Sequence, residues 1–193
     1  MKIRYRMKYR LIFMWLYLLA VYVPYCIIMF YRHDTNTISI SVIGWYTGGL
    51  QYLIAYLVLT LPIGLYLLFH LNRYIAGNYK WVYITSVLFC AFMIIGGFIP
   101  LRWEEQYLHI NTIHEYVSII STIGFMFVIW ITLIICACKS TLKLLYLVLL
   151  GVYPVVLIVG FFILWTSALY QLSATLSFLI ILLLVNTIAM LRR

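Results

Sequence analysis

Six long runs of apolar residues, separated by short polar segments, follow one another along the chain. They cover residues 11–31, 49–71, 81–99, 115–137, 144–164 and 169–191. A helix needs about 20 apolar residues to cross the hydrocarbon core of a bilayer, and each run is close to that length. None alternates between polar and apolar residues, as a barrel strand of about ten residues would. The pattern therefore predicts an all-α, polytopic membrane protein with one integral membrane domain, a six-transmembrane-helix bundle.

The composition supports lipid as the solvent of the outer surface. Of the 193 residues, 67% are hydrophobic and only 9% are charged. A soluble protein of this size must cover its surface with polar groups, and this chain has too few of them. The net charge of +9 could indicate a nucleic-acid partner, but the basic residues lie between apolar runs and form no basic face with base-reading neighbours. We therefore expect no nucleic acid among the partners.

Positive charge is distributed unequally between the two sides of the predicted bundle. When the six runs are threaded alternately through a bilayer, Arg32 and Arg102 fall on one side. The other side receives the remaining basic residues, which are Lys2, Arg4, Arg6, Lys8, Arg10, Arg73, Lys80, Lys139, Lys143, Arg192 and Arg193. Cytoplasmic loops of membrane proteins carry the excess of Lys and Arg, so both termini should be cytoplasmic (N-in/C-in). The expected location is the cell membrane, and the lack of an Asn-X-Ser/Thr sequon is compatible with a bacterial one.

The predicted outer side gathers the other polar chemistry. All four acidic residues fall there, together with three of the four histidines. Arg102, His109, His114 and Glu115 are the candidate ligand-binding residues, because ionisable groups at the edge of a span are functional candidates and Arg102 can neutralise an anionic group. The structural alternative is a solvated, hydrogen-bonded loop in which Glu115 occupies the first turn of a helix and is stabilised by the helix dipole.

A membrane-embedded, metal-dependent hydrolase or transferase is the enzymatic alternative. Its imidazole and carboxylate ligands would be His33, Asp34, His109, His114 and Glu115. His109 and His114 are five residues apart, about 140° around a helix, whereas two ligands on one helix prefer a spacing of three or four. His70 has no histidine at a similar depth that could complete a haem site. The leading interpretation therefore includes no metal and no cofactor.

Short motifs add a resemblance to a known family. The first outer loop contains Ile-Ser-Ile-Ser-Val-Ile-Gly at 38–44, the third run ends in Gly-Phe-Ile-Pro at 97–100, and a histidine stands at the start of the fourth run. With six spans, this pattern resembles the DRAM-like superfamily, which includes the Sfk-type proteins, and most of all its prokaryotic branch. The family positions present here are Ser39 or Ser41, Gly44, Gly97, Pro100 and His114. Ile99 is a departure, since the family pattern tends to run Phe-Pro directly.

The resemblance implies a compact six-helix bundle with an outward-facing polar pocket, and eukaryotic relatives linked to membrane-lipid handling and autophagy. It implies no reaction for the prokaryotic branch. The leading expectation is a bundle that binds membrane lipids or a membrane-protein partner through its outer face, with homo-oligomers also compatible. The enzyme described above is one alternative, and an accessory or immunity subunit of a larger membrane complex is another.

Overall fold

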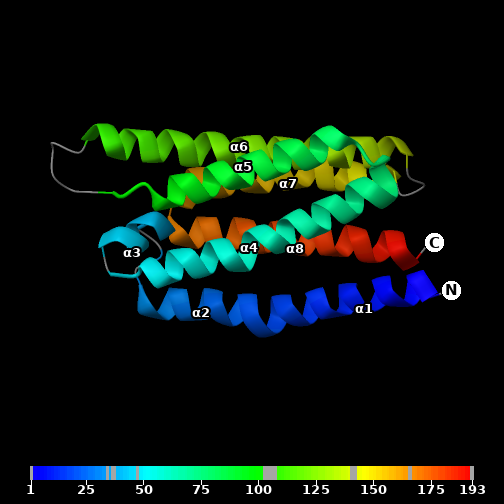
Figure 1. Ribbon diagram of the computed structural model, residues 1–193, viewed down its shortest axis with the longest axis horizontal. Helices are drawn as coiled ribbons and strands as arrows, with labels where there is room; N and C mark the ends of the chain where they lie inside the picture. Colours follow the sequence, from blue (N-terminus) through cyan, green and yellow to red (C-terminus); the bar gives the residue numbers. More distant parts are fainter. Residues whose placement is uncertain are drawn as a thin grey trace.

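The computed structural model describes residues 2–33, 35, 38–46, 48–101, 108–139, 143–164 and 167–191. Every element within these ranges is a helix, which confirms the prediction of an all-α chain. The long helices run side by side, and the short helix α3, Ile40–Tyr46, lies at one end of them (Figure 1).

The first predicted span is one continuous helix with a π-helical segment in its middle. Helix α1, Lys2–Tyr17, passes through η1, Leu18–Tyr22, into α2, Val23–Arg32. Pro24 is the second residue after the π-helical segment. A proline has no N–H to donate, and its ring clashes with the carbonyl four residues earlier in a regular α-helix. The wider turn accommodates the ring, so the helix continues to Arg32.

The other predicted spans correspond to helices whose bounds differ mostly by one residue. The helices are α4, Leu50–Leu71, continued by η2, Asn72–Ala76; α5, Lys80–Phe98; α6, Leu108–Lys139; α7, Lys143–Leu164; and α8, Ala168–Leu191. Helix α6 differs most, because it begins at Leu108 and not at 115. Glu115 therefore lies about two turns inside α6, where the dipole effect expected for a first turn has faded.

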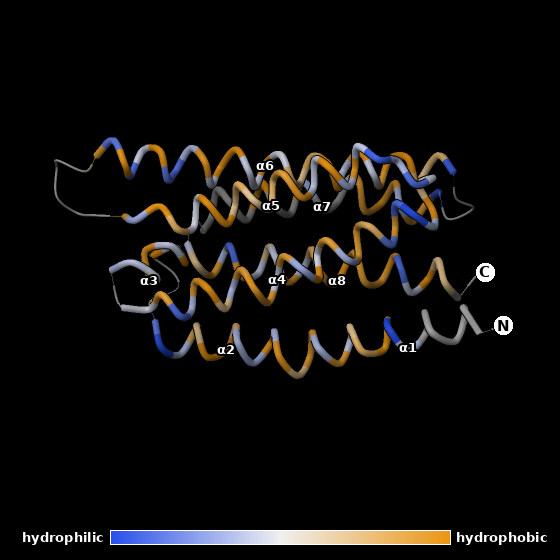
Figure 2. The backbone as a smooth tube through the Cα atoms, viewed as in Figure 1, coloured by the Kyte–Doolittle hydropathy of each residue, from blue (hydrophilic) through white to orange (hydrophobic). Residues whose placement is uncertain are grey.

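Five helical stretches within the described residues are long and apolar enough to cross a membrane. They are Tyr9–Arg32, Leu50–Ala76, Lys80–Phe98, Leu108–Lys139 and Ala168–Met190. Large apolar side chains point outward from them, and Phe13, Ile84 and Ile123 are each more than 60% exposed. Such a surface is costly in water and favourable in lipid. Figure 2 shows the apolar middles and more polar ends of the helices, as a multi-pass membrane protein requires.

Helices α4 and α8 form the centre of the bundle. The α1–α2 helix packs on α8, and α5, α6 and α7 lie on the opposite side (Figure 1). The last two long helices are in contact, since α7 packs against α8, and α8 also contacts α1 and α4.

Close backbone approach and polar links hold these helices together. A Cβ atom added to Gly96 on α5 would lie 2.9 Å from Oγ of Ser118 on α6, so this glycine allows the two helices to meet. On α4, the Tyr56 hydroxyl lies 2.7 Å from Oγ1 of Thr175 on α8. Small residues and interhelical hydrogen bonds are what membrane bundles use where lipid supplies no hydrophobic driving force between helices.

The two ends of the bundle differ in chemistry. Helix α1 begins and α8 ends at the same end, which we call the basic end (Figure 1). The helix bounds place five basic residues there, which are Arg10 on α1, Arg73 in η2, Lys80 and Lys143 at the starts of α5 and α7, and Lys139 at the end of α6. The opposite end, which we call the α3 end, carries α3 together with Arg32, His33, His109 and Glu115.

Candidate functional site

Three of the four ligand-binding residues predicted from the sequence, His109, His114 and Glu115, lie on different faces of α6 at the α3 end. His109 and Glu115 are exposed, whereas His114 is only 4% exposed. Nδ1 of His114 lies 2.9 Å from the carbonyl oxygen of Ile99 and must donate to it, so the ring fastens the end of α5 to α6. Arg102 lies outside the described residues. His114 thus joins two helices, and a ligand site shared by these four residues stays a prediction.

The first loop contributes one described histidine near the same end. The His33 ring packs edge-on against Tyr52, with ring centroids 5.0 Å apart, and Nη1 of Arg32 donates to the Tyr52 hydroxyl over 3.0 Å. Asp34 lies outside the described residues. Among those that are described, no group of three or more His, Cys, Asp or Glu side chains is placed to hold a metal ion. The alternative metal site stays a prediction.

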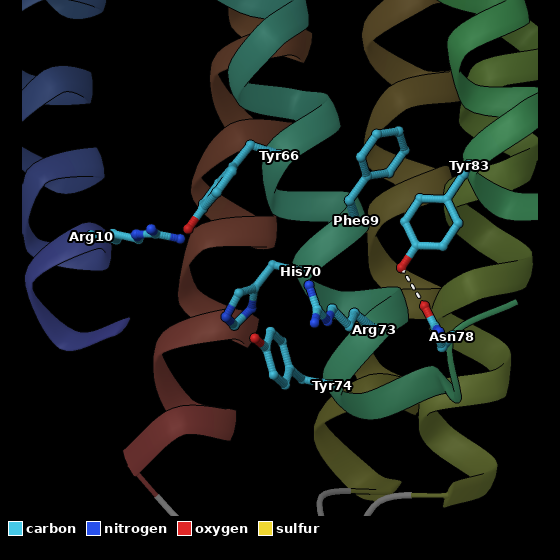
Figure 3. Close-up of a pocket in the computed structure, with 8 residues that line it drawn as sticks. All are labelled: Arg10, Tyr66, Phe69, His70, Arg73, Tyr74, Asn78 and Tyr83. Atoms are coloured by element: carbon cyan, nitrogen blue, oxygen red, sulfur yellow. Dashed lines mark hydrogen bonds between the residues drawn. The ribbon is translucent and has the colours of Figure 1, made fainter. Parts of the chain in front are cut away.

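A groove lies at the basic end, lined by residues of α1, α4, η2 and the start of α5 (Figure 3). Its volume is about 480 Å³, within the range of about 300–1,000 Å³ that small-molecule sites occupy. The lining residues are Arg10, Tyr66, Phe69, His70, Arg73, Tyr74, Asn78 and Tyr83. The groove therefore places two guanidinium groups and an imidazole among four aromatic rings.

Arg73 and His70 both lie against the ring of Tyr74. The guanidinium carbon of Arg73 is 5.6 Å from the centroid of the Tyr74 ring, and the rings of Tyr74 and His70 have centroids 4.6 Å apart. A cation over an aromatic face is attracted by the negative face of the ring. Figure 3 shows Arg10 extending from α1 toward Tyr66 on α4. The two arginines thus approach the groove from different helices.

The turn between η2 and α5 is fixed by the fully buried side chain of Asn72. Its Nδ2 donates to the carbonyl oxygen of Tyr79 over 2.9 Å, and its Oδ1 accepts from the Tyr79 backbone N–H over 3.1 Å. Gly77 and Asn78 have φ angles of 120° and 63°, a region that glycine and asparagine tolerate better than other residues. The Tyr83 hydroxyl donates to Oδ1 of Asn78 over 2.7 Å. The turn therefore holds Asn78 and Tyr83 as one wall of the groove.

His70 connects the groove to α8. Its Nδ1 lies 2.6 Å from Oδ1 of Asn186. Nδ2 of Asn186 donates to the carbonyl oxygens of Leu67 and Leu182 over 3.1 and 2.8 Å, which directs the amide oxygen toward His70. Nδ1 of His70 therefore carries the hydrogen and donates it to the Asn186 amide oxygen.

No carboxylate side chain comes from the segments that build the basic end. The four acidic residues of the chain are Asp34, Glu104, Glu105 and Glu115, so none falls within 2–17, 66–83, 139–143 or 186–191. The side chains of Arg10 and Arg73 are exposed. Near an anionic membrane surface, each basic side chain contributes about 1 kcal/mol of attraction to that surface. The groove is thus a cationic site that no acidic side chain of these segments neutralises.

Comparison with known proteins places the chain in no family. A scan against models of protein families finds no match, and searches of curated proteins and of solved structures find none. The similarity to the DRAM-like superfamily therefore stays a prediction. Of the positions that it rests on, the carbonyl oxygen of Gly97 accepts from Nε1 of Trp45 over 3.1 Å, and His114 binds the carbonyl of Ile99. Both contacts are ones that pack the α3 end.

Sequence reasoning did not find the groove at the basic end. It assigns Arg10 and Arg73 only to the cytoplasmic charge, and it tests His70 only as a haem ligand. The available indication was a spacing: Tyr66, His70 and Tyr74 follow one another at intervals of four, which puts them on one face of a helix. Two antiparallel spans then bring Arg10 beside that face.

Proposed function

We propose that this protein is a multi-pass membrane protein that binds the anionic headgroup of a membrane lipid in the groove at its basic end. The observation that carries the proposal is that Arg10 and Arg73 both line an aromatic groove of about 480 Å³ and that none of the described residues lining it is acidic. Guanidinium groups bind phosphate through paired hydrogen bonds, and tyrosine rings favour the headgroup level of a membrane. The sequence also predicts a lipid ligand, but at the α3 end. The present proposal assigns the lipid to the basic end.

Six crossings with both termini in the cytoplasm are part of the proposal. Helix α7 has 22 residues, which extend about 33 Å, and it packs against both α6 and α8. A sixth crossing by α7 would leave both termini on one side, as the positive charge of the basic end favours. The groove would then face the cytoplasmic leaflet, whose surface is negative because of its anionic lipids. A bacterial cytoplasmic membrane fits this arrangement.

Cysteine labelling tests the orientation. Cys26, Cys90, Cys136 and Cys138 are replaced by alanine, and single cysteines are introduced as Lys80→Cys at the basic end or His109→Cys at the α3 end, where both native side chains are exposed. A membrane-impermeant maleimide added to intact cells should label position 109 at once and position 80 only after permeabilisation. The reverse pattern would place the groove on the outer side and contradict the proposed orientation.

Lipid titration tests the groove. Purified protein in dodecyl maltoside is titrated with dioleoyl phosphatidylglycerol or dioleoyl phosphatidylcholine, and bound lipid is counted by native mass spectrometry. The double variant Arg10→Gln, Arg73→Gln should bind phosphatidylglycerol up to about 30-fold more weakly, since the loss of each exposed ion pair with the phosphate costs up to about 1 kcal/mol. The matched control, Lys80→Gln with Lys143→Gln, removes two exposed charges from the same end outside the groove. An equal loss in the control would show general surface attraction and reject the site.

Binding of a lipid or a membrane-protein partner through the α3 end is the second candidate. Exposed His109 and Glu115 on α6, and Arg32 with His33 around Tyr52, favour it, as does the resemblance to the DRAM-like superfamily. Photocrosslinking from position 109 in intact membranes would test it by identifying what the α3 end touches. Zinc analysis of the purified protein and a search for a stably co-purifying chain test the enzyme and the accessory-subunit alternatives.

A further inference from the structure

A second groove adjoins the groove at the basic end. Its volume is about 350 Å³, and it is lined by Tyr9, Arg10, Phe13, Met14 and Tyr66. Arg10 and Tyr66 line both grooves. A single molecule that contacts Arg10 can therefore extend from the cationic groove into this second, mainly apolar one.

The second groove leads from the basic end toward the middle of the bundle. Met14 follows Arg10 by four residues, so it lies on the same face of α1 about 6 Å farther in. Phe13 lies beside it and is 64% exposed. One turn beyond Phe13, the Tyr17 hydroxyl donates to the carbonyl oxygen of Leu59 over 3.2 Å and joins α1 to α4. Along α1, the charged Arg10 thus comes first and the apolar Phe13 and Met14 come next. The contact of Tyr17 with α4 then closes the space between the two helices.

We propose that the ligand is an anionic glycerophospholipid that lies across both grooves, with its phosphate between Arg10 and Arg73 and one acyl chain along Phe13 and Met14. The inference rests on the proposed function and specifies its ligand. The charge of the two arginines selects the phosphate, and the apolar wall selects the chain. A lipid in the leaflet at the basic end has its headgroup and chain in this same order. A soluble phosphate ester, by contrast, would contact the first groove alone.

Chain length is the variable that tests this ligand. The wild-type protein in dodecyl maltoside is titrated with glycerol 1-phosphate and with dihexanoyl, dioctanoyl and dioleoyl phosphatidylglycerol, each lipid measured relative to the phosphatidylcholine with the same chains. The affinity for phosphatidylglycerol should rise with chain length, and the ratio to the matched phosphatidylcholine, which reports the headgroup, should stay above one at each length. Glycerol 1-phosphate should bind at least about tenfold more weakly than the dioctanoyl lipid, since burial of two methylene groups accounts for such a factor.

A groove-filling variant locates the chain. Met14→Trp should lower the affinity for dioleoyl phosphatidylglycerol about tenfold and leave the binding of glycerol 1-phosphate unchanged. The matched control is Ile12→Trp, because Ile12 is 45% exposed on α1 and does not line the groove. Equal behaviour of the two tryptophan variants would overturn the assignment of the chain to the second groove. If Met14→Trp fails to fold, the chain-length titration of the wild-type protein tests the inference by itself. An affinity that is the same at every chain length would overturn it.

Failure of this inference is distinguishable from failure of the proposed function. If binding is lost in the double variant Arg10→Gln, Arg73→Gln and yet is equally strong for glycerol 1-phosphate and for the lipids, the result would reject the acyl-chain site and support the anion site. Binding that ignores both arginines removes the two proposals together.

Discussion

Breaking the contact between His70 and Asn186 should weaken the junction of α4 and α8 by a predictable amount. Asn186 makes two links to α4, one to Nδ1 of His70 at 2.6 Å and one to the carbonyl oxygen of Leu67 at 3.1 Å. Interhelical hydrogen bonds in membrane proteins contribute about 0.6 kcal/mol on average and about 1.7 kcal/mol at most. Asn186→Leu, similar in size, should therefore lower the free energy of unfolding by about 1–3 kcal/mol.

A double-mutant cycle isolates the bond to the histidine. His70→Phe, Asn186→Leu and the double variant are unfolded reversibly by titrating SDS into mixed micelles, with helicity followed by circular dichroism. The coupling energy should be about 0.6–1.7 kcal/mol, because each single variant already removes the shared bond. His70→Phe with Thr175→Val is the control pair, since Thr175 meets Tyr56 some 20 Å away along α4, and distant sites are additive. Coupling below about 0.3 kcal/mol in the test pair would refute the reasoning.

Three further variants probe the packing of the described helices. Gly96→Leu should destabilise the protein by about 1–3 kcal/mol in the same SDS titration, because the new side chain overpacks against Ser118, and an unchanged midpoint would mean that α5 and α6 are farther apart. Asn72→Leu should lower the free energy of unfolding by about 2 kcal/mol, because both hydrogen bonds to Tyr79 are lost. It should also speed proteolysis after Lys80, and a cleavage rate equal to that of the wild type would contradict this. His114→Phe should cost about 1 kcal/mol, whereas a loss of bound zinc or ligand instead would favour a functional histidine.

The membrane-spanning helices could be predicted from the sequence because lipid imposes a simple rule. A run of about 20 apolar residues has few alternatives to a helix in a bilayer. The bounds of α5 therefore differ from the predicted ones by one residue at each end, and those of α7 and α8 differ by one residue at the start and agree at the end. The start of α6 could not be predicted in this way. Its first turns carry polar residues such as His109 and Asn111, which composition assigns to a loop although they continue the helix.

The groove could not be predicted because it depends on which helices become neighbours. Hydrophobic patterns show where helices begin and end, but they do not determine which helices pack together. Arg10 and Arg73 are 63 positions apart and line one groove only because α1 and α4 both pack against α8. The role of His70 was hidden for the same reason, since its partner Asn186 lies on the last helix. Conversely, the cluster of histidines and carboxylates at the α3 end is visible in the sequence, yet His114 faces inward toward Ile99.

An experimental structure of the protein in nanodiscs of phosphatidylglycerol tests the central claim most directly. A headgroup phosphate should lie within hydrogen-bonding distance of the guanidinium groups of Arg10 and Arg73, with one acyl chain beside Met14. In nanodiscs of phosphatidylcholine alone, the lipid density at this position should be weak. A groove filled by side chains, or ordered phosphatidylglycerol bound only at the α3 end, would contradict the assignment of lipid binding to the basic end.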